Sequence, residues 1–141
     1  MKPTEVLTTE QRDAVLRRSD RKAWTAVMAT WMLTLTTLML VGHFPSIATL
    51  ALAWIVLPGR QLSLAVLMHE AGHGSLFKTR ALNRWVGQWL CALPVLSDFD
   101  AYARGHQAHH RLAGTAEDPD LPNYHAYPIS KASLKRKWFR D

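Results

Sequence analysis

The sequence predicts an all-α protein with more than one membrane-spanning helix, and three features carry that prediction. Two long apolar runs lie between residues 23 and 68 of a 141-residue chain that is 48% hydrophobic. Basic residues flank these runs, as they do in many membrane proteins. Five of the seven histidines then fall in two short clusters, whose spacings of three and four residues are those of one helix face.

Residues 1–22 are polar, and we expect them to form a leader on the cytoplasmic side. Thr8 or Thr9 is placed to cap a short helix that begins near Glu10. Five cations lie within residues 12–22, just before the first apolar run, namely Arg12, Arg17, Arg18, Arg21 and Lys22. The positive-inside rule places this part of the chain in the cytoplasm. Because the run begins too late for an ordinary signal peptide, we interpret it as a retained span.

Residues 23–41 are uncharged and predict the first span. At about 1.5 Å per residue, such a run nearly crosses a hydrocarbon core of roughly 30 Å. The turn that follows, around His43, contains no Lys or Arg, which places it on the outer side. Residues 46–68 predict the second span, which returns across the membrane. The pair Pro58-Gly59 is expected to kink or break that helix.

Residues 84–96 form a third apolar segment, which is too short to cross a bilayer. It contains Gly87 and Pro94, and we expect an interfacial or re-entrant helix. The chain after this segment is polar and stays on the cytoplasmic side. The predicted organisation is therefore a leader of residues 1–22, followed by one multi-pass membrane domain of residues 23–141.

The two histidine clusters are the residues best suited to chemistry. His69 and His73 are four positions apart, so they share one face of a helix. In the second cluster, His106 shares a face with His109 and His110. Neutral imidazole is a ligand of iron, zinc, copper and nickel. Each cluster therefore predicts one edge of a metal site.

One alternative uses the first cluster alone. The string His69-Glu70-Ala71-Gly72-His73 resembles the motif of membrane-anchored zinc metalloproteases, in which the glutamate is the general base. However, Leu76 and Thr79 stand where the longer metzincin motif has Gly and His. A zinc protease also has no use for a second cluster of three histidines. The zinc metalloprotease is therefore the weaker interpretation.

Taken together, the two clusters resemble the first two histidine boxes of the membrane fatty acid desaturase superfamily. The boxes are His69-x-x-x-His73 and His106-x-x-His109-His110. Their flanks are similar as well, namely Asn83-x-x-x-Gly87 between the boxes, residues 110–120 after the second box, and the basic stretch at residues 137–141. The resemblance covers roughly residues 30–141.

This resemblance implies a di-iron oxidoreductase. Members bind two irons through histidines on the cytoplasmic side of a four-span bundle. They activate O2 with electrons from a ferredoxin or a cytochrome b5-type donor, and they remove hydrogen from a CH2 group of an acyl chain in the membrane. Carried over by position, the iron ligands are His69, His73, His106, His109 and His110. Candidates for orienting the ring N–H groups of these ligands are Glu70, Asp118 and Asp120.

The resemblance also implies that the bundle is incomplete. A third box, a second His-x-x-His-His, does not occur in the sequence, and neither do two further apolar runs. We therefore expect an inactive fragment of a larger enzyme, a fatty acid desaturase that acts on an acyl-lipid or an acyl-CoA. A hydroxylase or ketolase of the same superfamily, with a carotenoid, alkane or sterol as substrate, is the alternative.

Composition excludes several other kinds of site and partner. A single cysteine, Cys91, excludes an intrachain disulfide and a cysteine-based metal site. The net charge is +6, but the basic residues are not interleaved with aromatic ones, so we expect no nucleic-acid partner. His43 lies at the predicted outer turn and His125 is isolated, so neither is expected to bind metal.

Overall fold

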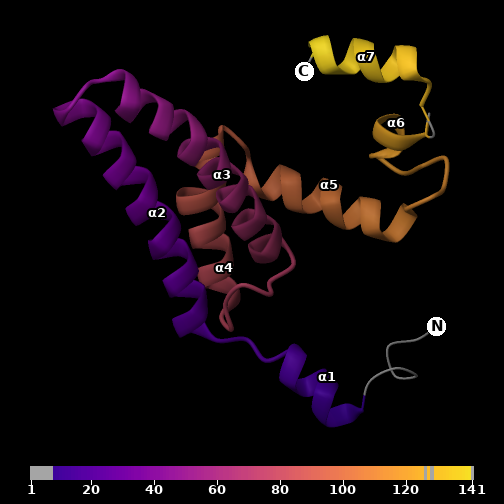
Figure 1. Ribbon diagram of the computed structural model, residues 1–141. Coiled ribbons are helices and arrows are strands. Elements are labelled where there is room, and N and C mark those ends of the chain that lie inside the picture. Colours follow the sequence, from indigo (N-terminus) through magenta and orange to yellow (C-terminus); the bar gives the residue numbers. More distant parts are fainter. Residues whose placement is uncertain (1–7, 126, 128, 141) are drawn as a thin grey trace. The chain divides into compact units, whose positions relative to one another are not determined.

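The computed structural model describes residues 8–125, 127 and 129–140, which form helices joined by short connections (Figure 1). No β-strand occurs among these residues, which agrees with the predicted all-α class. Residues 1–7 of the predicted leader lie outside the described residues, as does Asp141. The chain divides into two compact units at the boundary between Ala103 and Arg104.

The first unit contains most of the helical elements. They are α1 (Thr9–Val15), α2 (Asp20–His43), α3 (Ile47–Gly72), α4 (Arg80–Val86), the π-helical turn η2 (Gly87–Ala92), the 3-10 turn η3 (Leu93–Val95) and the start of α5 (Phe99–Leu112). The side chain of Thr8 caps α1, as the sequence predicts. Ser19 and Ser46 cap the two long helices by accepting backbone N–H groups of their first turns.

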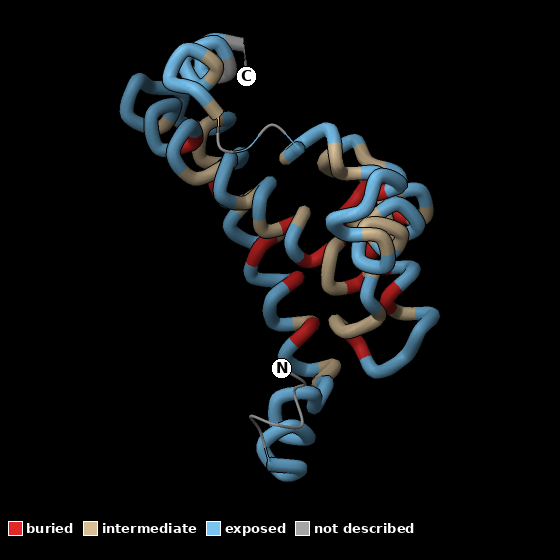
Figure 2. The backbone as a smooth tube through the Cα atoms, turned by 90° about the vertical axis from the view of Figure 1, so that its right-hand side faces the viewer, coloured by how far each residue is buried: buried red, intermediate tan, exposed pale blue. Residues whose placement is uncertain are grey.

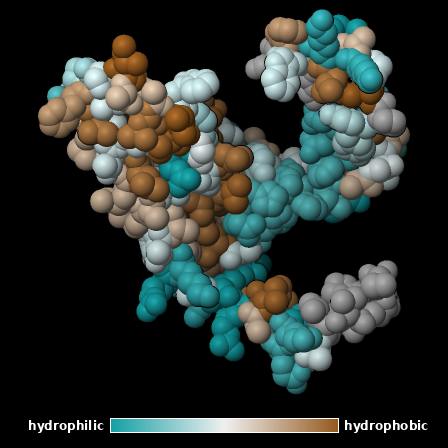
Figure 3. Space-filling model, viewed as in Figure 1, coloured by the Kyte–Doolittle hydropathy of each residue, from teal (hydrophilic) through white to brown (hydrophobic). Residues whose placement is uncertain are grey.

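The two long helices carry the only stretches, within the part of the chain that the structure describes, that are long and apolar enough to cross a membrane. Most of their large apolar side chains are exposed, including Met32, Leu38, Trp54 and Ile55. Figure 3 shows hydrophobic surface over these two helices, and Figure 2 shows that much of their length is exposed. The core helix of a soluble protein would bury such side chains. The exposed apolar surface therefore favours contact with lipid or with further apolar helices.

α3 is continuous through Pro58, so the helix does not break there, and the predicted alternative of a kink stays a prediction. Proline removes one backbone N–H from the helix, and helices in apolar surroundings tolerate this loss when neighbouring groups remain bonded.

The hydrophobic core of the first unit lies where α2, α3, α4 and η2 meet (Figure 2). Its fully buried side chains include Val27, Phe77, Val86 and Cys91. The ring of Trp24 on α2 packs edge-on against that of Phe77, with centroids 5.3 Å apart. These contacts fix the position of the C-terminal end of α3 relative to α2 and η2.

Polar contacts fasten the loop that follows α3. The side chain of Asn83 accepts the N–H of Phe77 at 2.9 Å and donates to the carbonyl of the same residue at 2.8 Å. The carboxylate of Asp20, at the start of α2, accepts the N–H of Lys78 at 2.8 Å. The Asn83 side chain is almost fully buried, so its amide must be satisfied internally, and the loop backbone satisfies it.

Residues 80–95 form one continuous helical run, close to the helix that the sequence predicts over residues 84–96, and its position at a membrane interface stays a prediction. α4 gives way to the π-helical turn at Gly87, and Pro94 lies in the 3-10 turn that follows. A Cβ atom at Gly87 would overlap the ring of Phe99, the first residue of α5. The missing side chain thus allows the start of α5 to pack directly on the turn. The indole N–H of Trp31 joins this turn to α2 by donating to the carbonyl of Leu90 at 3.0 Å.

The second unit contains the rest of α5, the single turn α6 (Leu121–Tyr124) and α7 (Lys131–Arg140). Gly114 follows α5 with a φ of +83°, a conformation that favours glycine. The chain therefore turns sharply after α5, which brings residues 118–124 back beside that helix.

Candidate metal centre

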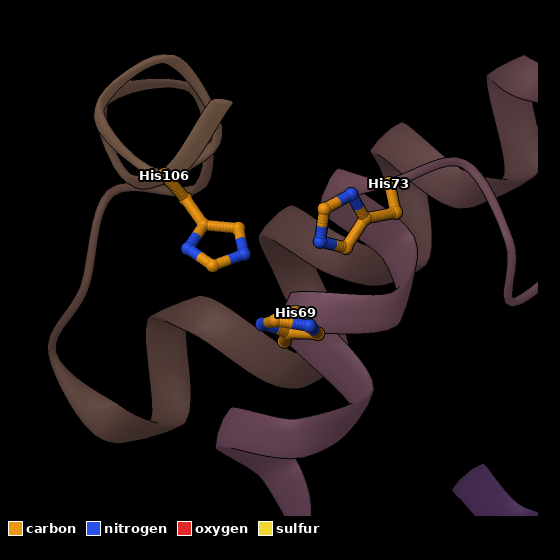
Figure 4. Close-up of side chains that lie close together, drawn as sticks. All are labelled: His69, His73 and His106. Atoms are coloured by element: carbon orange, nitrogen blue, oxygen red, sulfur yellow. The ribbon is translucent and has the colours of Figure 1, made fainter. Parts of the chain in front are cut away.

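His69 and His73 lie one helical turn apart at the C-terminal end of α3 (Figure 4). Their ring centroids are 4.6 Å apart, and the rings are inclined at 69°. Leu67, Met68 and Ala71 face the hydrophobic core from the same two turns. Burial of these three side chains therefore sets the rotation of α3 and turns both imidazoles to the other face.

A hydrogen bond within the first unit orients the ring of His69. Nδ1 of His69 is bonded to the hydroxyl of Tyr102 at 3.1 Å. α5 lies close to α3 at this point, since a Cβ on residue 72 would be in van der Waals contact with the Cβ of Ala103 at 3.6 Å. The bond to Tyr102 leaves Nε2 as the atom that His69 presents to a metal. Spacing alone did not reveal Tyr102, although it lies one turn before His106 in the sequence.

Glu70 accepts hydrogen bonds at the C-terminal end of α3. Its carboxylate accepts the hydroxyl of Ser75 at 2.6 Å, and the same hydroxyl lies 2.8 Å from the carbonyl oxygen of Glu70. The side chain therefore holds the loop after the first cluster. Its role toward the histidines stays a prediction.

The second cluster lies on α5 in the second unit, and Figure 4 also labels its first member, His106. The Nε2 atoms of His106 and His110 are 3.0 Å apart, with ring centroids 4.5 Å apart. Two nitrogens that each lie about 2.1 Å from a metal, at a right angle, are about 3 Å apart. The pair therefore has the geometry of two adjacent ligands of one ion.

The third member, His109, is held by a buried carboxylate. Nδ1 of His109 donates to Oδ1 of Asp118 at 2.8 Å, and the backbone N–H of Asp120 donates to the same oxygen at 2.8 Å. The hydroxyl of Tyr124 donates to Oδ2 of Asp118 and accepts the N–H of Gly114 at 3.1 Å. Because a carboxylate only accepts, Nδ1 of His109 carries the hydrogen and Nε2 is left for a metal.

These hydrogen bonds favour the ionised form of the Asp118 carboxyl. Burial of Asp118 raises the pKa of its carboxyl, but hydrogen bonds from Tyr124, His109 and the Asp120 backbone outweigh it and lower the pKa to about 2. The hydrogen bond to Asp118 raises the pKa of His109. The sequence offered Asp118 and Asp120 as orienting carboxylates, and the carboxylate of Asp120 lies 3.6 Å from Nδ1 of His109. Tyr124 was missed, because nothing in its spacing marks it.

The two remaining histidines outside the clusters are bonded to their own helices. Nδ1 of His43 lies 3.0 Å from the carbonyl of Met39, and Nδ1 of His125 lies 3.1 Å from that of Leu121. Both side chains are exposed. The expectation that neither binds metal stays a prediction.

The donor set suits a transition metal. The five clustered histidines offer imidazole nitrogens, which iron and zinc both accept. A carboxylate that accepts a ring N–H, as Asp118 does from His109, is the usual partner of a metal-binding histidine. The side chains of both units therefore fit the role of metal ligands.

Comparison with known proteins gives a family. The sequence profile of the fatty acid desaturase family matches residues 45–141, a range that contains both histidine clusters. The chain is also similar to the sn-1 acyl-lipid omega-3 desaturase (ferredoxin) of Synechocystis sp., with 29% identity over 87 residues. That alignment covers 61% of this chain and 23% of the relative, so it spans about a quarter of the relative's length. No solved structure matches the chain.

Proposed function

Because the chain belongs to the fatty acid desaturase family, we propose that it is part of an O2-dependent di-iron enzyme that introduces a C=C bond into an acyl chain. The observation that carries the proposal is the family match, which runs without interruption across both histidine clusters. Family membership makes the parent protein an oxidoreductase. Its substrate and its reaction are the parts that need a test.

The proposed iron ligands are His69, His73, His106, His109 and His110. Within each unit, neighbouring imidazoles lie at distances that suit adjacent ligands. When bound, the two irons would supply the activation of O2 that removal of hydrogen from an unactivated CH2 group requires. Five histidines are fewer than two irons need. Further ligands would therefore come from the rest of the enzyme, and we expect these 141 residues to be inactive alone.

The polar partners of the histidines have a separate role in the proposal. Asp118 and Tyr102 bond to ring nitrogens, and in doing so they select which nitrogen faces a metal. The Asp118 carboxylate also adds negative charge beside a cluster of neutral ligands. This charge would favour binding of a divalent cation over an empty cluster.

The proposed setting is a membrane, with the site on the cytoplasmic side. The family and the two apolar helices favour a membrane protein. The basic leader and the uncharged turn after α2 favour an orientation in which the histidine-bearing end of α3 faces the cytoplasm. An acyl chain dissolved in the bilayer would then lie beside the site. The printed name of the Synechocystis relative supports an acyl-lipid substrate and a ferredoxin electron donor.

The test is to express the complete open reading frame in a host that lacks the activity and to identify its fatty acids by mass spectrometry. We expect new double bonds, which disappear in His69→Ala and His106→Ala variants. His43→Ala is the matched control, because its ring is bonded to its own helix turn and it lies outside the two clusters, and it should keep the activity. Hydroxylated products would instead favour a hydroxylase or ketolase. Purified protein that holds zinc and no iron would overturn the proposal.

A further inference from the structure

α7 is a short helix with an unusual concentration of positive charge. Its ten residues, KASLKRKWFR, include five Lys and Arg residues and neither Asp nor Glu. A helix of this composition attracts an anionic partner. The histidine chemistry makes no use of it, because all the proposed ligands precede α7.

The same helix also presents large apolar side chains to its surroundings. Leu134 is 55% exposed, Trp138 is 81% exposed and Phe139 is 78% exposed. Such exposure of an adjacent Trp and Phe in an aqueous setting is unfavourable. We therefore expect an apolar surface to cover these side chains.

Charge and apolar surface are combined on one face of α7. Lys131, Leu134, Lys135 and Trp138 follow the spacing i, i+3, i+4, i+7, which places them in one stripe along the helix. Lysine can lay its aliphatic stem on an apolar surface while its ammonium group reaches a more polar layer. Trp prefers the same boundary between headgroups and hydrocarbon.

From this combination we propose that α7 lies in the surface of the bilayer and binds anionic lipid headgroups. Its apolar side chains would enter the headgroup–acyl boundary, and its cations would contact the phosphates of anionic lipids. An acidic protein would match the charge of α7, but it would offer no hydrocarbon to cover Leu134, Trp138 and Phe139. The lipid surface matches both properties. This role is independent of the reaction that the histidines support.

Site-directed labelling of the 141-residue chain in lipid nanodiscs tests the proposal. A cysteine is introduced either on the apolar stripe, as Leu134→Cys, or beside it, as Ser133→Cys, and it carries an environment-sensitive fluorophore. Cys91 is fully buried, so the parent chain serves as the control for background labelling. Circular dichroism verifies that each variant keeps its helices. Nanodiscs contain either phosphatidylcholine alone or an equimolar mixture with phosphatidylglycerol.

We expect the Leu134→Cys label to shift its emission to the blue and to lose access to iodide in the mixed nanodiscs only. The Ser133→Cys label should stay accessible in both. Each cation near an anionic surface contributes about fivefold to binding, so the double change Lys135→Gln with Arg136→Gln should reduce the bound-to-free ratio by about 25-fold. High salt should act in the same direction.

Three outcomes would overturn the proposal. Equal shielding of the Leu134→Cys label in neutral and anionic nanodiscs would show that the cations of α7 do not determine its membrane binding. Exposure of that label in both would remove the membrane contact altogether. Exposure in both nanodiscs that ends when an acidic ferredoxin is added would assign α7 to a protein partner.

Discussion

The two histidine clusters are held in place by different forces. His69 and His73 lie on a helix whose opposite face is buried in the core, so hydrophobic packing sets their position. The second cluster lies on the polar helix α5, whose described residues include only one buried side chain, Phe99. There the buried carboxylate of Asp118 provides the anchor through hydrogen bonds.

The difference shows two ways in which a protein can position histidine side chains. Packing fixes a helix axis and rotation without constraining the protonation of a ring. A hydrogen bond to a carboxylate selects the ring nitrogen that carries the hydrogen, and it adds charge. Changes in the core should therefore alter stability, whereas changes around Asp118 should alter metal affinity.

The strongest test of the packed region uses Cys91, which lies outside the two long helices. Burial raises the pKa of its thiol from 9.0 to about 12. The thiolate population at neutral pH therefore falls by about a thousandfold, and reaction with maleimide should slow by at least that factor relative to Ser133→Cys. Mass spectrometry over time gives both rates. Similar rates at the two positions would show that the first unit opens readily.

The next largest effect is expected from Gly87→Ala. The new methyl group would overlap the ring of Phe99, and relief of the overlap requires a shift in a packed core. We expect a loss of about 2 kcal/mol in the free energy of unfolding. Gly105→Ala is the matched control, because open space surrounds that position and alanine favours a helix. Equal stability of the two variants would contradict the close contact.

Asp118→Asn tests the hydrogen-bonded region. The substitution keeps the shape but removes the negative charge that His109 and Tyr124 contact. Loss of such a partner lowers metal affinity by about tenfold or more. Titration with Co²⁺, followed by absorption, measures the affinity. Asp100→Asn serves as the control because that carboxylate pairs with Arg84 at 2.6 Å on the exposed surface. An unchanged Co²⁺ affinity in Asp118→Asn would show that this carboxylate does not support metal binding.

The smallest effect is expected from Tyr102→Phe. The change keeps the ring but removes the hydroxyl that bonds to His69. One such hydrogen bond contributes about 1 kcal/mol, so Co²⁺ affinity should fall by about fivefold. The free energy of unfolding should change little. A loss as large as that of Asp118→Asn would show that polar contacts dominate both clusters, and it would break the distinction between them.

Hydropathy predicted the two long helices because a spanning run is a property of consecutive residues. The change of helix type within residues 84–96 was not predictable in this way. It occurs at Gly87, where the ring of Phe99 packs closely, and this contact is visible only in the fold. The sequence could not decide whether Pro58 breaks α3 for a related reason, because the surroundings of a helix decide whether it tolerates a proline.

The histidines themselves were evident from spacing, since a helix brings residues three and four apart onto one face. Their partners were not. Tyr102 reaches His69 across 33 residues, and Asp118 reaches His109 because the chain turns after α5. Tyr124 contacts Asp118 from six residues later, and nothing in that spacing marks the contact. Asp118 was selected as a candidate through the resemblance of its segment to a known motif. Physical reasoning from the sequence alone gives no reason for its burial.

The bond between Trp31 and Leu90 has a consequence for how the chain is made. Its two ends are 59 residues apart, and the contact between Asp20 and Lys78 spans 58. During synthesis α2 leaves the ribosome long before either partner exists, so it must wait with an indole N–H and a carboxylate unpaired. α3 can pair with it first. The turn that carries Leu90 is synthesised later, and it then packs onto a helical hairpin that is already formed.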